Sequence, residues 1–184
     1  MRHIWDEVVC GVNSFLNTLR AFAPPGSTMR LAVFNDALTD VYRGDAATCP
    51  DLQLSAAVCS GRALPLDALA CALRARSTRP ILLLFSGGVN EAELNCRVDQ
   101  TAQLVAALLQ RDSSEVIYLG MRHDALSCAS RLAVPRRTTL RVSPSLPRAA
   151  LQAAAAAVQA AVLHGTRVTF TPDHRLFSDP CIAR

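Results

Sequence analysis

The chain has 184 residues, of which 51% are hydrophobic and 18% are charged, a composition that suits one compact globular domain. No apolar run is long enough to cross a bilayer, and Met1–Glu7 lacks the apolar stretch of a secretory signal peptide. The seven cysteines are scattered without a C-x-x-C pair, which favours free thiols in a reducing compartment. We therefore expect an intracellular, cytoplasmic protein that does not enter a membrane.

The formal net charge of +4 is carried by arginine alone, because the sequence contains no lysine. Guanidinium groups match phosphate oxygens, so an arginine-only chain raises the possibility of phosphate or nucleic-acid binding. Arg136, Arg137 and Arg141 are the candidates for phosphate contacts, since they lie together near the last predicted strand. The other arginines are spread along the whole chain, which favours a simple compositional bias over a nucleic-acid interface.

The apolar periodicity predicts alternating helices and strands. Residues 4–22 place aliphatic side chains at helical spacing and predict an amphipathic helix. A strand over Arg30–Asn35 follows, with Asp40–Arg43 returning antiparallel to it, and residues 45–60 are expected to be a loop. The remaining predictions, in chain order, are a helix over Leu66–Arg76, a strand at 81–85, a helix over Val98–Arg111, a strand over Glu115–Gly120, a helix over Asp124–Leu132 with Asp124 as its N-cap, a strand over Thr138–Val142, a helix over Leu146–His164 capped by Gly165, an extended segment Thr166–Thr171, and an irregular tail from Pro172.

One stretch indicates where a site would lie. Ile81–Phe85 is continuously apolar, as expected for a strand buried on both faces in a parallel sheet covered by helices. Ser86-Gly87-Gly88 ends the run, and in open α/β sheets ligands bind just beyond the carboxyl ends of such strands. We therefore expect residues 86–91 to belong to any site that the protein has.

Several segments, taken in order, resemble an intracellular subgroup of von Willebrand factor A-type (vWA) domains. The resemblance covers the chain from Ile4 to Arg175. It implies a vWA-like (Rossmann-like) α/β three-layer sandwich over residues 1–175, with an irregular tail at 176–184. Its sheet would be mainly parallel with one antiparallel edge strand, and helices would cover both faces. The segments that carry the resemblance are Gly11-Val-Asn-Ser-Phe-Leu16, Leu31-Ala-Val-Phe-Asn-Asp36, Val41-Tyr42-x-Gly44, Gly61-x-x-Leu64-x-x-Asp67-Ala68-Leu69, Leu119-Gly120-x-x-x-Asp124-Ala125, Pro135-x-x-Thr138-Thr139-Leu140 and Val168-Thr-Phe-Thr171.

The resemblance also implies where a metal ion would bind, and this chain departs from the pattern there. vWA domains typically hold a divalent cation through D-x-S-x-S after the first strand, a later Thr, and an Asp after the central strand. The D-x-S-x-S element is absent, Ala63 stands at the Thr position, and Ser86 stands at the Asp position. Hard cations require anionic oxygen ligands, so we expect no metal, with a Mg²⁺ site rebuilt from the nearby Asp67, Asn90 and Glu91 as a weaker alternative.

These observations predict a non-catalytic protein-interaction or scaffold module, without a cofactor, that binds an unidentified protein partner. The candidate partner-binding residues are Arg62, Ser86, Gly87, Gly88 and Asn90. One alternative is a nucleic-acid-associated protein that uses its arginines. Another is a truncated vWA domain whose first strand is encoded upstream of Met1.

The missing first strand leads to a prediction about the sheet, because in vWA domains that strand lies between the counterparts of 30–35 and 80–85. Three arrangements avoid unpaired backbone groups there: the flanking strands pair directly, Val168–Thr171 enters between them, or a partner chain donates a strand. We expect direct pairing of Leu31–Phe34 with Leu82–Phe85.

Overall fold

The buried run at 81–86 forms strand β3 (Ile81–Ser86), which pairs in parallel with β4 (Glu115–Gly120). β4 pairs in parallel with the short β5 (Thr139–Arg141), so a three-stranded parallel sheet has the order β3-β4-β5. A computed structural model describes residues 2–34, 38–53, 65–74, 80–87, 91–111, 114–121 and 123–178. Every residue of β4 is buried, as expected for a central strand covered on both faces.

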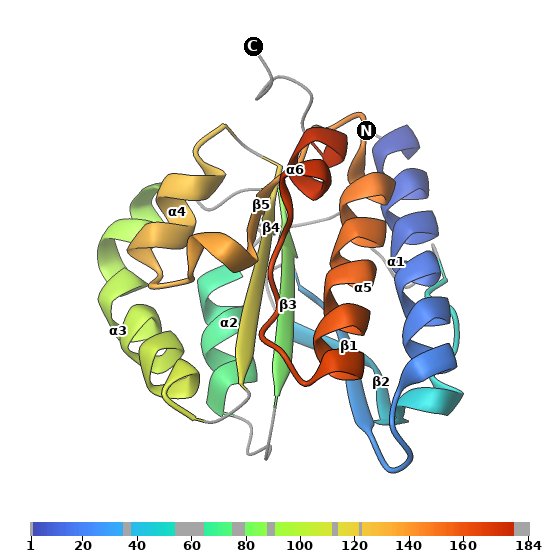
Figure 1. Cartoon of the computed structure of the whole chain (residues 1–184). Coiled ribbons are helices and arrows are strands. Elements are labelled where there is room, and N and C mark those ends of the chain that lie inside the picture. The colour runs from blue at the N-terminus through green and yellow to red at the C-terminus, as the bar shows by residue number, and fades with distance from the viewer. Residues whose placement is uncertain are drawn as a thin grey trace.

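Helices cover both faces of this sheet (Figure 1). On one face lie α1 (Arg2–Phe22) and α5 (Pro147–His164), which pack against each other. The other face is covered by α2 (Pro65–Arg74), α3 (Glu91–Leu109) and α4 (Ala125–Arg131). Each face has its own apolar cluster, because alternate side chains of the strands point to opposite sides.

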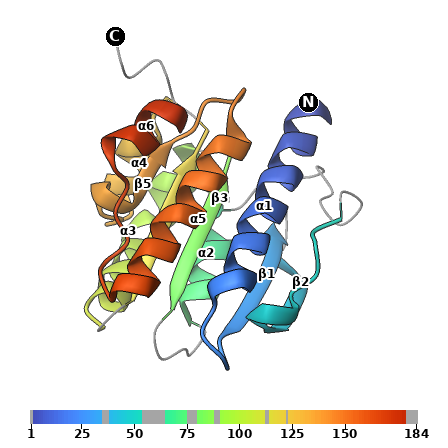
Figure 2. The ribbon, with the colours of Figure 1, turned by 45° about the vertical axis from the view of Figure 1, so that its right-hand side comes forward.

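A second sheet lies beside the first. It consists of β1 (Thr28–Phe34) and β2 (Leu38–Asp45), paired antiparallel with an irregularity between Leu31 and Ala32, and followed by the short helix η1 (Ala46–Thr48). Figure 2 shows β1 on the side of β3 that faces away from β4. The α/β class, the antiparallel return strand and the helices on both faces are confirmed, but the hydrogen-bonded strands form two sheets where one was expected.

The predicted pairing of Leu31–Phe34 with Leu82–Phe85 is therefore wrong. Within the residues that the structure describes, β1 hydrogen-bonds only to β2 as a strand neighbour, and β3 only to β4. Phe34 of β1 and Leu82 of β3 nevertheless pack against the same apolar cluster, although no backbone hydrogen bonds pair the two strands.

The prediction of an irregular tail from Pro172 is wrong for the part of the tail that the structure describes. This part forms α6 (Pro172–Ser178), which runs past the predicted boundary at 175, after an extended stretch that lies along β5. The Phe170 N–H donates to the Arg137 carbonyl at 2.8 Å, and the Arg175 guanidinium donates to the Thr139 carbonyl at 3.0 Å. The tail is thus bound to the outer edge of β5, on the opposite side of the sheet from β1.

The start of α6 has the geometry of a capping box. The Thr171 hydroxyl accepts from the His174 N–H at 3.3 Å, and His174 Nδ1 accepts from the Thr171 N–H at 3.3 Å. In this arrangement His174 takes the place that Glu or Gln usually occupies. The sequence signal was Thr171 followed by Pro172 at the first helical position, a common helix start.

We expect α6 to lose stability in acid. Burial lowers the pKa of His174 below its ordinary value of 6.5, with a smaller opposing effect of Asp173, so the fold favours the neutral ring that accepts from Thr171. As the pH falls through 6.5, the unfolded segment binds a proton before the folded one does, and this contribution to stability is lost. Hydrogen exchange of residues 172–178 at pH 7.5 and pH 5.5 should show faster exchange in acid after correction for intrinsic rates. A His174→Gln variant should not show this change, and equal acid sensitivity in that variant would contradict the assignment.

Candidate functional site

The register of the parallel sheet brings three positions into line at its carboxyl edge. Ser86 pairs with Gly120, and Gly120 pairs with Arg141. The ladder continues one residue further, because the Met121 N–H donates to the Ser86 carbonyl at 3.0 Å and the Val142 N–H donates to the Gly120 carbonyl at 2.8 Å. The three strands are therefore hydrogen-bonded as far as this edge, which is where α/β proteins bind their ligands.

The three aligned positions differ in what they offer a ligand. Ser86 is only 2% exposed, Gly120 is buried and has no side chain, and Arg141 is half-buried. Gly87 is exposed, and a Cβ there would meet only Met121 Cε, at 3.7 Å. Beyond Ser86, then, the described part of this edge exposes the backbone of Gly87.

The remaining predicted site residues are placed only in part. Asp67 lies in the first turn of α2 and is half-buried, and Glu91 is the first residue of α3, where its side chain is not described. The predictions that lie outside the described residues are those for Arg62, Ala63, Gly88 and Asn90.

The ligand set for a metal ion is not assembled in the part of the chain that the structure describes. No group of three His, Cys, Asp or Glu side chains lies close enough to hold an ion among these residues. At the aligned edge, the last residue of β3 is the neutral Ser86, and Arg141 stands two strands away.

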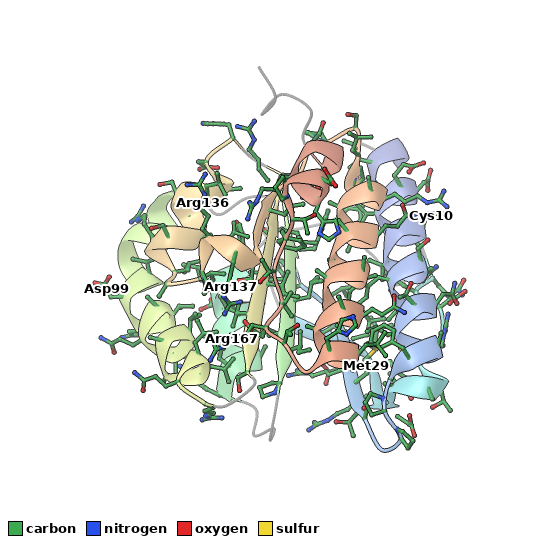
Figure 3. All side chains as sticks on the ribbon, in the orientation of Figure 1. Cys10, Met29, Asp99, Arg136, Arg137 and Arg167 are labelled. Carbon is green, nitrogen blue, oxygen red and sulfur yellow. The ribbon has the colours of Figure 1, made fainter. Side chains whose placement is uncertain are left out.

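The three arginines that were candidates for phosphate contacts are divided between two ends of β5. Arg141 lies at its carboxyl end, whereas Arg136 and Arg137 belong to the short helix η3 (Arg136–Thr138) before its amino end. Figure 3 shows Arg136 and Arg137 on the same side of the molecule as α4. Arg136 is exposed, while Arg137 is half-buried and takes part in the fold.

Arg137 forms an ion pair with a carboxylate that the sequence analysis did not single out. Its Nη1 lies 2.9 Å from Glu115 Oε2 and also donates to the Val168 carbonyl at 2.7 Å. Glu115 opens the buried strand β4, and its side chain is only 4% exposed. The sequence contains an indication of this pair, because Glu115 stands at the start of a buried apolar strand and a buried carboxylate requires a partner.

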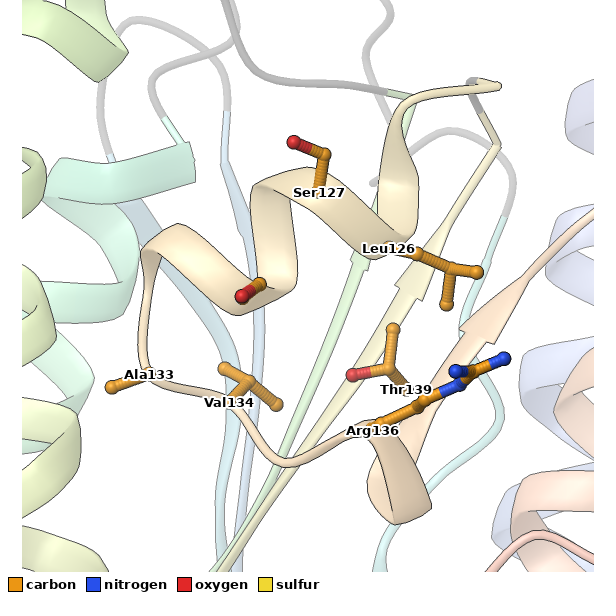
Figure 4. A pocket seen from close by; sticks show the side chains of 7 residues that line it. Leu126, Ser127, Ala133, Val134, Arg136 and Thr139 are labelled. Carbon is orange, nitrogen blue, oxygen red and sulfur yellow. The ribbon is translucent and has the colours of Figure 1, made fainter.

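A pocket of about 500 Å³ lies between α4 and β5 (Figure 4). The described side chains around it include the hydroxyls of Ser127, Ser130 and Thr139 and the guanidinium of Arg136, and none of them is a carboxylate, imidazole or thiol. The Thr139 hydroxyl is occupied, because it donates to the Pro135 carbonyl at 3.0 Å. Among the described residues that line this pocket, none could act as a general base.

The cysteines that the structure describes agree with the expectation of free thiols. Cys10 and Cys71 are exposed, while Cys49 and Cys128 are buried, and all four are free. Burial raises the pKa of the Cys49 thiol, more than the nearby Arg20 lowers it, which makes this cysteine a poor nucleophile.

Asp124 precedes α4 as predicted, but it makes no side-chain capping bond, because its backbone has φ −90° and ψ 6° where an N-cap residue is extended.

Comparisons of the chain with protein-family models, curated proteins and solved structures found no match. None of the described helices is both long enough and apolar enough to span a membrane.

Proposed function

We propose that this chain is a non-catalytic protein-interaction module with a vWA-like fold, which binds its partner without a metal ion. The observation that carries the proposal is the alignment of Ser86, Gly120 and Arg141 at the carboxyl edge of the parallel sheet. A metal-dependent vWA site needs an anionic ligand where Ser86 stands. Here that position carries the neutral, buried Ser86, and the exposed backbone of Gly87 just beyond it suits contact with a polypeptide.

The absence of catalysis is part of the same proposal. It is supported by the pocket beside α4, where the described lining residues include no acid or base, and by Cys49, whose thiol pKa is raised by burial. The division of Arg136 and Arg137 from Arg141, together with the ion pair of Arg137, favours a protein partner over a nucleic acid.

The metal-free part of the proposal predicts a calorimetric result. Titration of the full chain with Mg²⁺, Mn²⁺ or Ca²⁺ should give no saturable heat up to about 1 mM, the weak end of the range for protein calcium sites. Binding in the micromolar range would contradict the proposal, because it would require anionic ligands contributed by the loops around the edge.

The interaction part is tested by two surface substitutions with opposite expectations. Gly87→Arg places a large side chain on the proposed edge, since Gly87 is exposed and a Cβ there makes an ordinary contact with Met121 Cε. Leu163→Asp is the matched control, because Leu163 is 62% exposed near the end of α5. Affinity capture followed by quantitative mass spectrometry should recover a partner with the wild-type chain and with Leu163→Asp, but not with Gly87→Arg. Equal recovery with all three chains would contradict the placement of the interface.

A further inference from the structure

The edge of β3 that faces away from β4 has unpaired backbone groups in the described part of the chain. The Pro80 carbonyl accepts from the Glu115 N–H at 3.0 Å, and the Ser86 carbonyl accepts from the Met121 N–H at 3.0 Å. Even-numbered residues of β3 therefore direct their backbone groups toward β4. Because backbone groups alternate along a strand, those of Ile81, Leu83 and Phe85 point the other way, toward β1 (Figure 2).

The same alternation identifies the open edge of β1. The Ser27 carbonyl accepts from the Ala46 N–H at 2.9 Å, which places the odd-numbered residues of β1 in hydrogen-bonded pairs with β2. The extra residue at the irregularity lies in β2, so the alternation of β1 itself continues. The backbone groups of Arg30, Ala32 and Phe34 therefore point away from β2, and we call these two sets of groups the open edges of β1 and β3.

Apolar clusters lie on both sides of the open edges. On one side, Phe34 and Leu82 pack against the cluster formed by α2, α3 and α4. On the other side, Leu83 and Phe85 pack with residues of α1 and α5. Residues Leu31–Phe34 are only half-buried, and so are Leu82, Leu83 and Phe85, whereas all of β4 is buried. The helix layers on both faces could therefore cover a further strand between β1 and β3, where these residues are only half-buried.

Two ways of closing the open edges within the chain do not occur. β1 and β3 do not pair with each other, and Val168 and Phe170 lie against the other side of the sheet, where Phe170 donates to Arg137 and the Val168 carbonyl accepts from it. Unpaired strand edges are templates for a further strand.

We propose that an extended, apolar segment of a partner protein inserts between the open edges of β1 and β3 and pairs with both. This proposal rests on the proposed function, since it names the class of partner that the module binds. The segment must be apolar on both of its faces, because one face meets the α1–α5 layer and the other meets the α2–α3 layer. Its backbone supplies the hydrogen bonds, as in other cases of β-augmentation.

The probe is a synthetic peptide in which six alternating valine and isoleucine residues, the length of β3, are flanked by lysines for solubility. We expect dye-labelled peptide to bind the full chain saturably in fluorescence anisotropy. Hydrogen exchange should slow at 28–34 and 81–86 in the complex, while 139–141, on the far edge, should not change.

Two sets of modified peptides distinguish insertion from binding at a single edge. N-methylation of either alternate set of residues should weaken binding by at least about tenfold, since each blocked bond leaves a buried backbone group unpaired. At a single edge, only one of the two sets would matter. Aspartate residues on either face should also abolish binding, because both faces of an inserted strand are buried.

Three results would overturn the proposal. The first is no binding of the unmodified peptide, and the second is loss of binding on N-methylation of one set only. The third is strong protection of 28–34 and 81–86 in the free chain, which would show that these edges are already closed, whether within one chain or between two copies. If the peptide fails while partner capture remains sensitive to Gly87→Arg, strand insertion is wrong and the interaction module stands.

Discussion

Replacing Gly120 with alanine should destabilise the fold by about 2 to 3 kcal/mol, the usual cost of forcing a carbon atom into a packed core. A Cβ at this position would lie 2.7 Å from Ala125 Cβ and 2.7 Å from Tyr118 Cε1. Both neighbours are about 1% exposed and have no free space to move into. The backbone cannot shift either, since Gly120 pairs with Ser86 on one side and with Arg141 on the other.

Gly87→Ala is the matched control for this substitution. Gly87 lies next to the strand position that pairs with Gly120, but its Cβ would make only an ordinary contact, and its backbone does not have a positive φ. We expect the control to change the free energy of unfolding by less than about 0.5 kcal/mol, as is usual for an exposed position. Urea denaturation of the three chains measures both effects. A Gly120→Ala chain as stable as the wild type would show that α4 is not packed against β4 as described.

Strands β3 and β4 of the parallel sheet were predictable because each is a run of mostly apolar residues. Glu115–Gly120 was assigned to its exact bounds, and Ile81–Phe85 to within one residue, since a strand buried on both faces needs consecutive apolar residues. The end of α5 was equally clear, because Gly165 adopts the left-handed conformation with φ 61° that a helix C-cap requires.

The errors arose where structure depends on polar contacts or on distant parts of the chain. α3 begins at Glu91, seven residues before the predicted start at Val98, because its first two turns are largely polar and lack the periodic signal. The division into two sheets could not be predicted from strand patterns. The sequence of β1 is that of a strand, but it does not show whether β1 pairs with β3 as well as with β2.

The candidate site shows the same division between local and non-local information. The position of Ser86 and Gly87 after a buried strand was predicted from the local sequence, and the structure places them at the carboxyl edge. The approach of Arg141 to that edge depends on the register of two further strands, which no local pattern specifies. Arg137 and Glu115 are 22 positions apart, so their ion pair is also a product of the fold.

That ion pair leads to the second large effect that we expect. Arg137→Met should destabilise the chain by about 3 kcal/mol, the lower end for breaking a buried pair, since the Arg137 side chain is 28% exposed. The Glu115 side chain is 4% exposed, and its Oε1 has no hydrogen-bond partner within the described residues, so loss of the guanidinium leaves a buried carboxylate without its ion-pair partner. The Val168 carbonyl loses its donor as well, which loosens the tail on β5.

A double substitution separates the cost of an isolated charge from the loss of packing. Arg137→Met combined with Glu115→Leu removes both charges, and it should recover about 2 kcal/mol relative to Arg137→Met alone, because replacing a whole buried pair by apolar groups is often neutral. Arg30→Met is the matched surface control. Its partner Asp40 lies 2.6 Å away, and the Arg30 side chain is 30% exposed, much like that of Arg137, but the Asp40 side chain is 39% exposed. Loss of this pair should therefore cost less than about 1 kcal/mol. Urea denaturation of all four chains completes the comparison, and a double variant no more stable than Arg137→Met would mean that the buried carboxylate is not what makes the loss of Arg137 costly.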